Sequence, residues 1–142
     1  MQRELGYDEC LAMLEHHRFG RLGVRDAEGV YIVPISYAFG PGALFGHAPP
    51  GHKLQLMRLW PHVALEIDEV EDAAHWRAVL VKARFEEIEG ANDRADARLR
   101  LLAAAGGNVS AVTAGHGHRV HLADATLFRL RIESVSGRAE SW

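Results

Sequence analysis

The segment from Val30 to Lys53 limits the possible folds of this chain more than any other part of the sequence. Residues 30–39 carry apolar side chains at both odd and even positions, a pattern typical of a strand that is covered on both faces. Pro34 removes one hydrogen-bond donor from this strand, because proline has no backbone N–H, and so leaves backbone groups available for a planar polar ligand. After a Gly-Pro-Gly turn, residues 43–47 are expected to form the next strand.

A Gly/Pro-rich loop at residues 48–51 then delivers His52 and Lys53 to the start of a predicted helix at 52–60, which Pro61 ends. The first N–H groups of a helix have no partner within it, and the helix dipole places partial positive charge there. A lysine at this position adds a full positive charge, which favours a bound phosphate. Together with the preceding strand, the loop predicts a site for a phosphorylated, ring-bearing cofactor.

The hydrophobic pattern of the other segments predicts a mainly β chain. Residues 76–87 alternate apolar and charged side chains, as a strand with one buried face does. Six strands joined mainly by hairpins favour a six-stranded antiparallel barrel, closed or nearly closed, with peripheral α-helices. The strands are predicted at 18–26, 30–39, 43–47, 62–68, 76–87 and 127–135, and helices after Asp8, at 52–60 and at 92–105.

Capping and turn residues predict where these elements begin and end. Asp8 is expected to cap the first helix, which ends before Gly20. Asn92 is expected to cap the last helix, which the pair Gly106-Gly107 closes. Residues 69–72 are expected to form a charged turn between two strands.

Composition restricts the classes of protein that fit. With 142 residues, of which 48% are hydrophobic and 25% charged, the chain predicts a single globular domain spanning residues 1–142. The net charge of −3 and the scattered cations exclude a basic stripe, so no nucleic-acid partner is expected. Cys10 is the single cysteine, which rules out an intramolecular disulfide, and no apolar run is long enough to cross a bilayer. No membrane association and a cytoplasmic location are therefore expected.

Five segments, in this order, resemble the FMN-binding split-barrel family related to pyridoxamine 5′-phosphate oxidase. Within it, they are most similar to the short bacterial branch that includes nitroimidazole-resistance (Nim-type) proteins. The resemblance implies a six-stranded antiparallel split β-barrel. The segments are RFGRLGV (18–24), YIVPISYAF (31–39), LFGHAPPGHK (44–53), the run at 65–88 and FRLRIESVSGR (128–138).

The resemblance also implies a homodimer with FMN bound in two equivalent sites across the interface. One group of residues is expected to line the isoalloxazine ring, a second to hold the ribityl phosphate, and a third to reach the site from the other subunit. These groups are Val33, Pro34, Ile35, Ser36 and Tyr37; His47, Ala48, Gly51, His52 and Lys53; and Trp76 and Arg77.

Two positions depart from the family pattern at the predicted phosphate loop. Ala48 stands where family members often have a hydroxyl residue, and His52 where they often have an arginine. Each missing charge-assisted hydrogen bond weakens binding by about 1.5–3 kcal/mol, so weak retention of FMN is expected. His47 is the candidate catalytic residue, since an imidazole at the end of the strand can donate a proton during a flavin-mediated reduction. Packing under the loop is the alternative interpretation of His47.

The expected function is that of an FMN-dependent oxidoreductase. Electrons would come from a donor such as NAD(P)H and pass to a small aromatic or nitro-containing acceptor. The chain lacks the Arg-x-His motif that pyridoxamine-phosphate oxidases carry near the C-terminus, so oxidation of vitamin B6 is not assigned.

Three alternatives remain open from the sequence. One is a non-catalytic protein that stores or senses flavin, which the absence of a substrate motif favours. A second is a metal or haem binder that uses the histidine-rich loop with His116, His118 and His121, although no acidic or cysteine ligand accompanies them. The third is a protein that binds the deazaflavin F420 in place of FMN.

Overall fold

The computed structural model describes residues 1–106 and 125–142, and it confirms the expected mainly β, antiparallel architecture with peripheral helices. None of the helices in these two ranges is long and apolar enough to cross a membrane. The elements are β1 (Gln2–Glu4), α1 (Tyr7–His16), β2 (Phe19–Asp26), β3 (Gly29–Ser36), β4 (Ala38–Gly40), β5 (Ala43–Ala48), α2 (His52–Leu59), β6 (His62–Asp72), β7 (His75–Glu87), α3 (Ala91–Ala104) and β8 (Thr126–Glu140).

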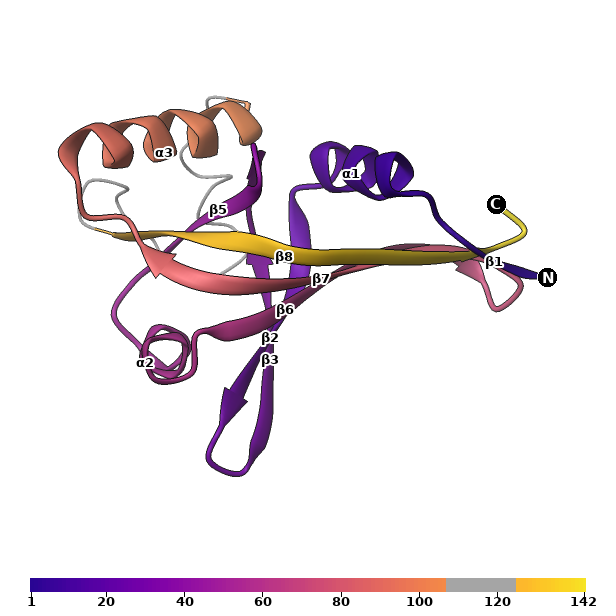
Figure 1. Ribbon diagram of the computed structural model, residues 1–142, viewed down its shortest axis with the longest axis horizontal. Helices are drawn as coiled ribbons and strands as arrows, with labels where there is room; N and C mark the ends of the chain where they lie inside the picture. The colour runs from indigo at the N-terminus through magenta and orange to yellow at the C-terminus, as the bar shows by residue number, and fades with distance from the viewer. Residues whose placement is uncertain (107–124) are drawn as a thin grey trace.

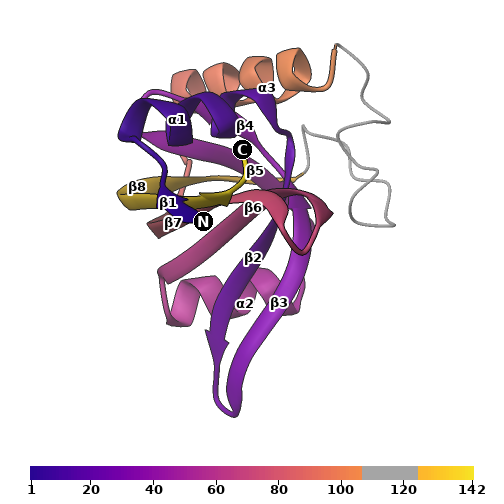
Figure 2. The ribbon, with the colours of Figure 1, turned by 90° about the vertical axis from the view of Figure 1, so that its right-hand side faces the viewer.

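One antiparallel sheet contains all the strands, in the order β3-β2-β6-β7-β8-β5-β4, with the short β1 paired to β8. The two edge strands, β3 and β4, are consecutive in the chain and only Tyr37 separates them. The sheet therefore curls until its edges meet at this residue, which is the split-barrel arrangement. Helices α1 and α3 lie on one side of the sheet and α2 lies on the other, while the β2–β3 hairpin projects beyond the barrel (Figures 1 and 2).

The predicted strand at 30–39 is divided in two at Tyr37. The backbone N–H of Tyr37 donates to the carbonyl of Arg18 at 2.8 Å, and its hydroxyl donates to the carbonyl of Leu14, also at 2.8 Å. The first bond ties the end of β3 to the start of β2, and the second ties it to α1. Together with the short β1, this division raises the strand count from the predicted six to eight.

The structure corrects the predicted charged turn at 69–72. These residues belong to β6, where Glu69 pairs with Arg77 of β7, and the turn is formed by Ala73 and Ala74 instead. A charged segment can remain a strand here because the hairpin extends past the barrel, where both faces are accessible to water. Strand β8 likewise continues to Glu140, beyond the predicted end at 135, because it pairs with β7 along this extension.

Both predicted helix caps lie two residues after the observed ones. Helix α1 begins after Gly6, whose backbone N–H donates to the Glu9 carboxylate at 3.1 Å, so Asp8 lies in the first turn and is not the cap. Helix α3 begins after Gly90, so Asn92 is also inside the helix. At the other end of α3, Gly106 has the positive φ of +67° expected of a closing glycine. Gly107 lies outside the described residues.

The hydrophobic core occupies the interior of the barrel and continues under two helices. The inner face of β7 is buried as predicted, and α1 adds Met13 and Leu14 to the same cluster. A second cluster lies under α3, where Ala97 and Leu101 pack against Phe45 of β5. The buried β7 positions are Val79, Val81, Ala83 and Phe85.

The opposite, outer face of strands β3, β2, β6 and β7 is partly apolar, and no helix of the described residues covers it. The strand register places several large apolar side chains on this face, because paired residues in adjacent strands point to the same side. The pairs that establish this are Ile32 with Gly23, Phe19 with Ser36, Leu80 with Glu66, and Glu66 with Arg21. Val30 and Ile32 are 70% and 66% exposed. Within the single chain this face of residues 30–36 is uncovered, so its cover by a second subunit, which the two-sided apolar pattern predicts, stays a prediction.

A substitution at Gly46 measures how tightly the interior of the barrel is packed. A Cβ atom at Gly46 of β5 would lie 2.5 Å from Cζ of the buried Phe128 ring, so Gly46→Ala is expected to destabilise the fold by about 1–3 kcal/mol. The matched control is Gly23→Ala in β2, where the nearest atom would be 3.9 Å away and stability should change little. Urea unfolding of both variants measures the difference, and equal stabilities would contradict the packing shown here.

Candidate functional site

The corner between β5 and α2 gathers most of the residues predicted to hold a phosphate. His47 and Ala48 are the last two residues of β5, and a three-residue loop leads from them to His52 at the start of α2. His47 is 1% exposed and Ala48 is fully buried, whereas Gly51 and His52 are exposed and Lys53 is half-buried. The structure therefore brings these five predicted residues into one corner.

Electrostatics at this corner favour an anion. Burial lowers the pKa of Lys53 to about 8, because the charged form loses hydration. The helix dipole places further positive charge at the N-terminus of α2, and the first turn of α2 contains no acidic residue. A lysine ammonium at a positive helix end attracts an anion.

His47 is neutral at neutral pH in this environment. Burial lowers the pKa of its imidazole to about 4, and the positive charge of Lys53 lowers the pKa further in the same direction. A neutral imidazole offers an N–H to a hydrogen-bond acceptor, but it releases a proton much less readily than an imidazolium does. An anion at Lys53 would raise the pKa of His47. The role of His47 as a proton donor stays a prediction.

The predicted ring-binding segment of β3 presents two different faces. Ile35 and Tyr37 are buried in the barrel core, whereas Pro34 is exposed and lies opposite Arg21 on the outer face. Val33 is half-buried against the core, and Ser36 lies on the same face as Pro34. A ligand on the outer face of β3 would therefore meet the side chains of Pro34 and Ser36 and the backbone of their neighbours.

An aromatic contact joins this segment to the phosphate corner. His52, at the start of α2, packs edge to face against Tyr31 of β3, with 5.0 Å between the ring centroids. The contact joins α2 to the core-facing side of β3, on which Tyr31 and Val33 lie, and Pro34 and Ser36 lie on the opposite face. His52 stands where the family often has arginine, and here its ring takes part in this packing.

Trp76 and Arg77 lie far from that corner within one chain. Figure 1 shows the β6–β7 turn beside the chain termini, at the opposite end of the long axis from α2. Arg77 is held there by Glu69, to which its Nε donates at 2.7 Å, and its guanidinium lies 4.7 Å from the ring centroid of Trp142. One chain does not bring these residues to Lys53, and their delivery from a second subunit stays a prediction.

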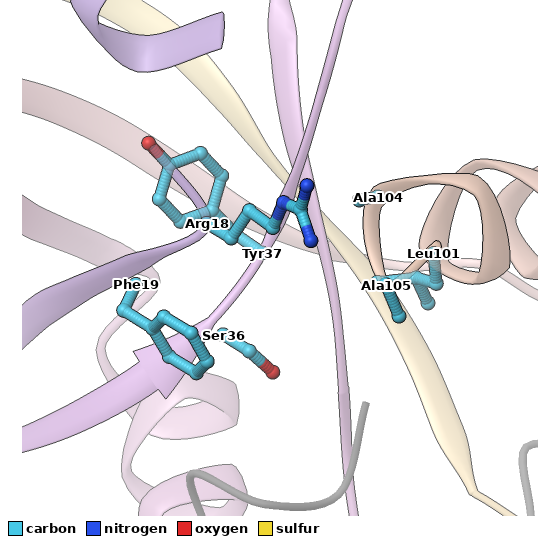
Figure 3. A pocket seen from close by; sticks show the side chains of 7 residues that line it. All are labelled: Arg18, Phe19, Ser36, Tyr37, Leu101, Ala104 and Ala105. Carbon is cyan, nitrogen blue, oxygen red and sulfur yellow. The ribbon is translucent and has the colours of Figure 1, made fainter. Parts of the chain in front are cut away.

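A small cavity that sequence reasoning missed lies at the end of β3 (Figure 3). It has a volume of about 60 Å³ and lies where Phe19 of β2 pairs with Ser36 of β3, facing the last turn of α3. The segment at 18–24 signalled only a family resemblance, and no local pattern relates it to α3. The residues that line the cavity are Arg18, Phe19, Ser36, Tyr37, Leu101, Ala104 and Ala105.

No metal site accompanies these features in the part of the chain that the structure describes. Within residues 1–106 and 125–142, no group of three potential metal-binding side chains occurs. His116, His118 and His121 lie outside these residues, so the alternative of a histidine-rich metal or haem site stays a prediction.

Comparison with known proteins identifies the family. The model of the pyridoxamine 5′-phosphate oxidase family matches residues 7–139. The chain belongs to this family. A solved structure of an FAD-binding protein from Mesorhizobium loti has a TM-score of 0.85 and 30% identity, with 99% of each chain covered.

A second solved structure shares the fold, and one further relative matches in sequence. A candidate 5-nitroimidazole antibiotic resistance protein from Bacteroides thetaiotaomicron aligns with a TM-score of 0.74 at 12% identity, covering 98% of this chain and 89% of that one. An uncharacterized protein from Rhizobium meliloti is 33% identical over 86 residues. That match spans 61% of this chain and 57% of the relative. What the names of these relatives say about binding or activity applies to those proteins.

The pKa of His47 generates a stability prediction. The folded chain binds a proton at His47 only near pH 4, whereas the unfolded chain does so near pH 6.5, so lowering the pH through this window favours unfolding. The loss attributable to His47 is expected to be about 2 kcal/mol between these pH values. His47→Gln should flatten this slope, as measured by urea unfolding at pH 4.5 and 7.

The control variant His62→Gln changes an exposed histidine and leaves His47 in place, so it should keep the wild-type slope. An unchanged slope in His47→Gln would show that His47 is not the buried neutral base found here.

Proposed function

We propose that this chain is a flavin-binding protein that uses FMN. The observation that carries the proposal is the half-buried Lys53 at the N-terminus of α2, with no acid in the first turn, beside a family-typical β3 segment. Membership of the pyridoxamine 5′-phosphate oxidase family and similarity to an FAD-binding protein along nearly the whole chain support a flavin. Lys53 and the free N–H groups of α2 would hold the phosphate, and the outer face of β3 would meet the ring.

The chain's own residues make this phosphate site weaker than the family pattern. Ala48 is fully buried and has no hydroxyl to donate, and the His52 ring packs on Tyr31. Lys53 is thus the principal cation of the site, and the backbone amides of α2 supply the other donors. FMN is expected to bind measurably but to be lost during extensive washing.

The proposed activity is that of an oxidoreductase. The bound flavin would supply electron transfer from a donor such as NAD(P)H to a small aromatic or nitro-containing acceptor. The protein would orient the ring on β3 and hold His47 as a neutral hydrogen-bonding group beneath the phosphate loop. The buried Tyr37 hydroxyl, which donates to Leu14 and whose pKa burial raises, is already engaged in the fold.

A non-catalytic flavin carrier is the second candidate. It is favoured by the state of two predicted site residues, because His47 is neutral and the Tyr37 hydroxyl is held by a carbonyl. Retention of FMN without reduction by NADH or NADPH would favour the carrier, whereas turnover with a nitroaromatic acceptor would favour the oxidoreductase.

We further propose a homodimer formed through the outer face of β3, β2, β6 and β7. Val30 and Ile32 are each more than half exposed on this face, and an apolar sheet face in water favours association. Charged side chains lie among them, with Arg21 bound to both Glu66 and Asp68 at 3.0 Å, so the face also contains polar groups able to fix the register of a partner. A symmetric dimer would bring the β6–β7 turn of one subunit to the β3 segment of the other.

Loss of the Lys53 charge should weaken cofactor binding. Lys53→Met is expected to lower the affinity for FMN about 10- to 100-fold, because one charge-assisted contact with the phosphate is removed. Binding to the wild type should also weaken above about pH 8, where the ammonium begins to lose its proton, although the bound phosphate moves this limit upward. Quenching of flavin fluorescence on titration measures both effects.

Arg98→Met is the matched control, because Arg98 lies on α3, on the opposite side of the sheet from α2 (Figure 1) and away from the proposed interface. FAD and F420 are titrated in parallel, so that a preference for either corrects the identity of the cofactor. Equal FMN affinity in the wild type and in Lys53→Met would overturn the phosphate site.

The proposed interface predicts the oligomeric state. The wild type should sediment as a dimer, and Ile32→Lys should shift it toward monomer while keeping the circular dichroism spectrum, because Ile32 lies outside the barrel core. Leu99→Lys is the control, since Leu99 is equally exposed but lies on α3. A monomeric wild type, or a dimer insensitive to Ile32→Lys, would contradict this interface.

A further inference from the structure

The cavity at the end of β3 is built on a fixed framework. Phe19 of β2 and Ser36 of β3 are paired in the sheet. The neighbouring backbone hydrogen bond, from the Tyr37 N–H to the Arg18 carbonyl, fixes the two strands at this point. The Tyr37 hydroxyl is held by Leu14, so its ring is an immobile wall. The last turn of α3 forms the opposite side, where Ala104 and Ala105 extend no farther than Cβ and leave the space open.

Arg18 supplies the charge of this cavity. Its guanidinium is directed past the Tyr37 ring toward the end of α3 (Figure 3). Across residues 1–106 and 125–142, Arg18 forms no ion pair, in contrast to Arg21 and Arg77. The C-terminus of α3 carries about half a negative charge, so the full charge of the guanidinium leaves the cavity with a net positive character.

The rest of the lining is apolar and aromatic. Phe19 is 53% exposed at the mouth of the cavity, where one face of its ring is accessible to a ligand. The volume of about 60 Å³ is several times what one water molecule requires but far below the space that a drug-sized ligand occupies. The cavity is smaller than the roughly 150 Å³ that encloses benzene, so a single ring would lie partly inside it, with the remainder of the ligand against the exposed Phe19 ring.

We propose that this cavity binds a small aromatic carboxylate, with the Arg18 guanidinium holding the carboxylate group and Phe19 contacting the ring. The planar guanidinium can donate two parallel hydrogen bonds to a carboxylate, and the aromatic side chains of the cavity favour contact with a planar apolar ring. Ser36 belongs both to this cavity and to the predicted ring-binding segment, so a ligand here would lie next to the flavin. The role of this ligand as electron acceptor rests on the proposed function, whereas the binding of the ligand to the cavity does not depend on that proposal.

Titration of benzoate, followed by backbone amide NMR shifts of protein without added flavin, tests the proposal. Benzoate should bind with a Kd of about 0.1–1 mM and shift the amides of Phe19 and Tyr37. Arg18→Gln should weaken binding about 10- to 100-fold, because the charged donor is lost. The neutral analogue benzamide should bind the wild type at least about tenfold more weakly.

Two further variants complete the test. Ala105→Leu fills the cavity from the end of α3 and should abolish benzoate binding. Arg98→Gln also removes one arginine charge, but from α3 and outside the cavity, and it should leave benzoate binding unchanged. Absence of benzoate binding to the wild type, or equal binding to Arg18→Gln, would overturn the proposal. FMN affinity measured on the same variants separates the two hypotheses, because loss of flavin binding with retained benzoate binding would overturn the proposed function alone.

Discussion

Two hydrogen bonds of Tyr37 hold together the parts of this structure on which the rest depends. The backbone bond to Arg18 ends β3 and allows the chain to turn into β4, so that the two edges of one sheet meet. The hydroxyl bond to Leu14 fastens the same point to α1. Because a buried hydroxyl without a partner is costly, the two bonds specify a single position for this residue. Barrel closure, the bare outer face of β3 and the Arg18 cavity all follow from that position.

The second organising feature is positive charge near each end of β3. Lys53 is half-buried at a positive helix end, and its charge acts on the buried imidazole of His47. At the other end of β3, Arg18 faces a cavity without a carboxylate among the described residues. Burial removes hydration from the Lys53 ammonium, whereas the Arg18 guanidinium is exposed, and a bound anion would be attracted to either cation. The phosphate and the carboxylate proposed above would bind at these two cations.

Local sequence patterns predicted the elements well and their ends less well. The alternation in residues 76–87 predicted the buried face of β7, because side chains in a strand point alternately to its two sides. The predicted caps Asp8 and Asn92 were wrong, because glycines upstream let each helix start earlier. The charged residues 69–72 were read as a turn, yet pairing with β7 keeps them in a strand. Pairing energy from a distant segment outweighed local preference there.

The sequence by itself determined the class of fold, the family and the phosphate corner, because these depend on short-range periodicity and on residues adjacent in the chain. His47, Ala48, Gly51, His52 and Lys53 lie close in space because they lie close in sequence. Only the tertiary structure decided that Arg18 and Phe19 face the end of α3, and that Trp76 and Arg77 lie far from Lys53. Those relations depend on strand register and barrel closure, which join segments that no local pattern connects.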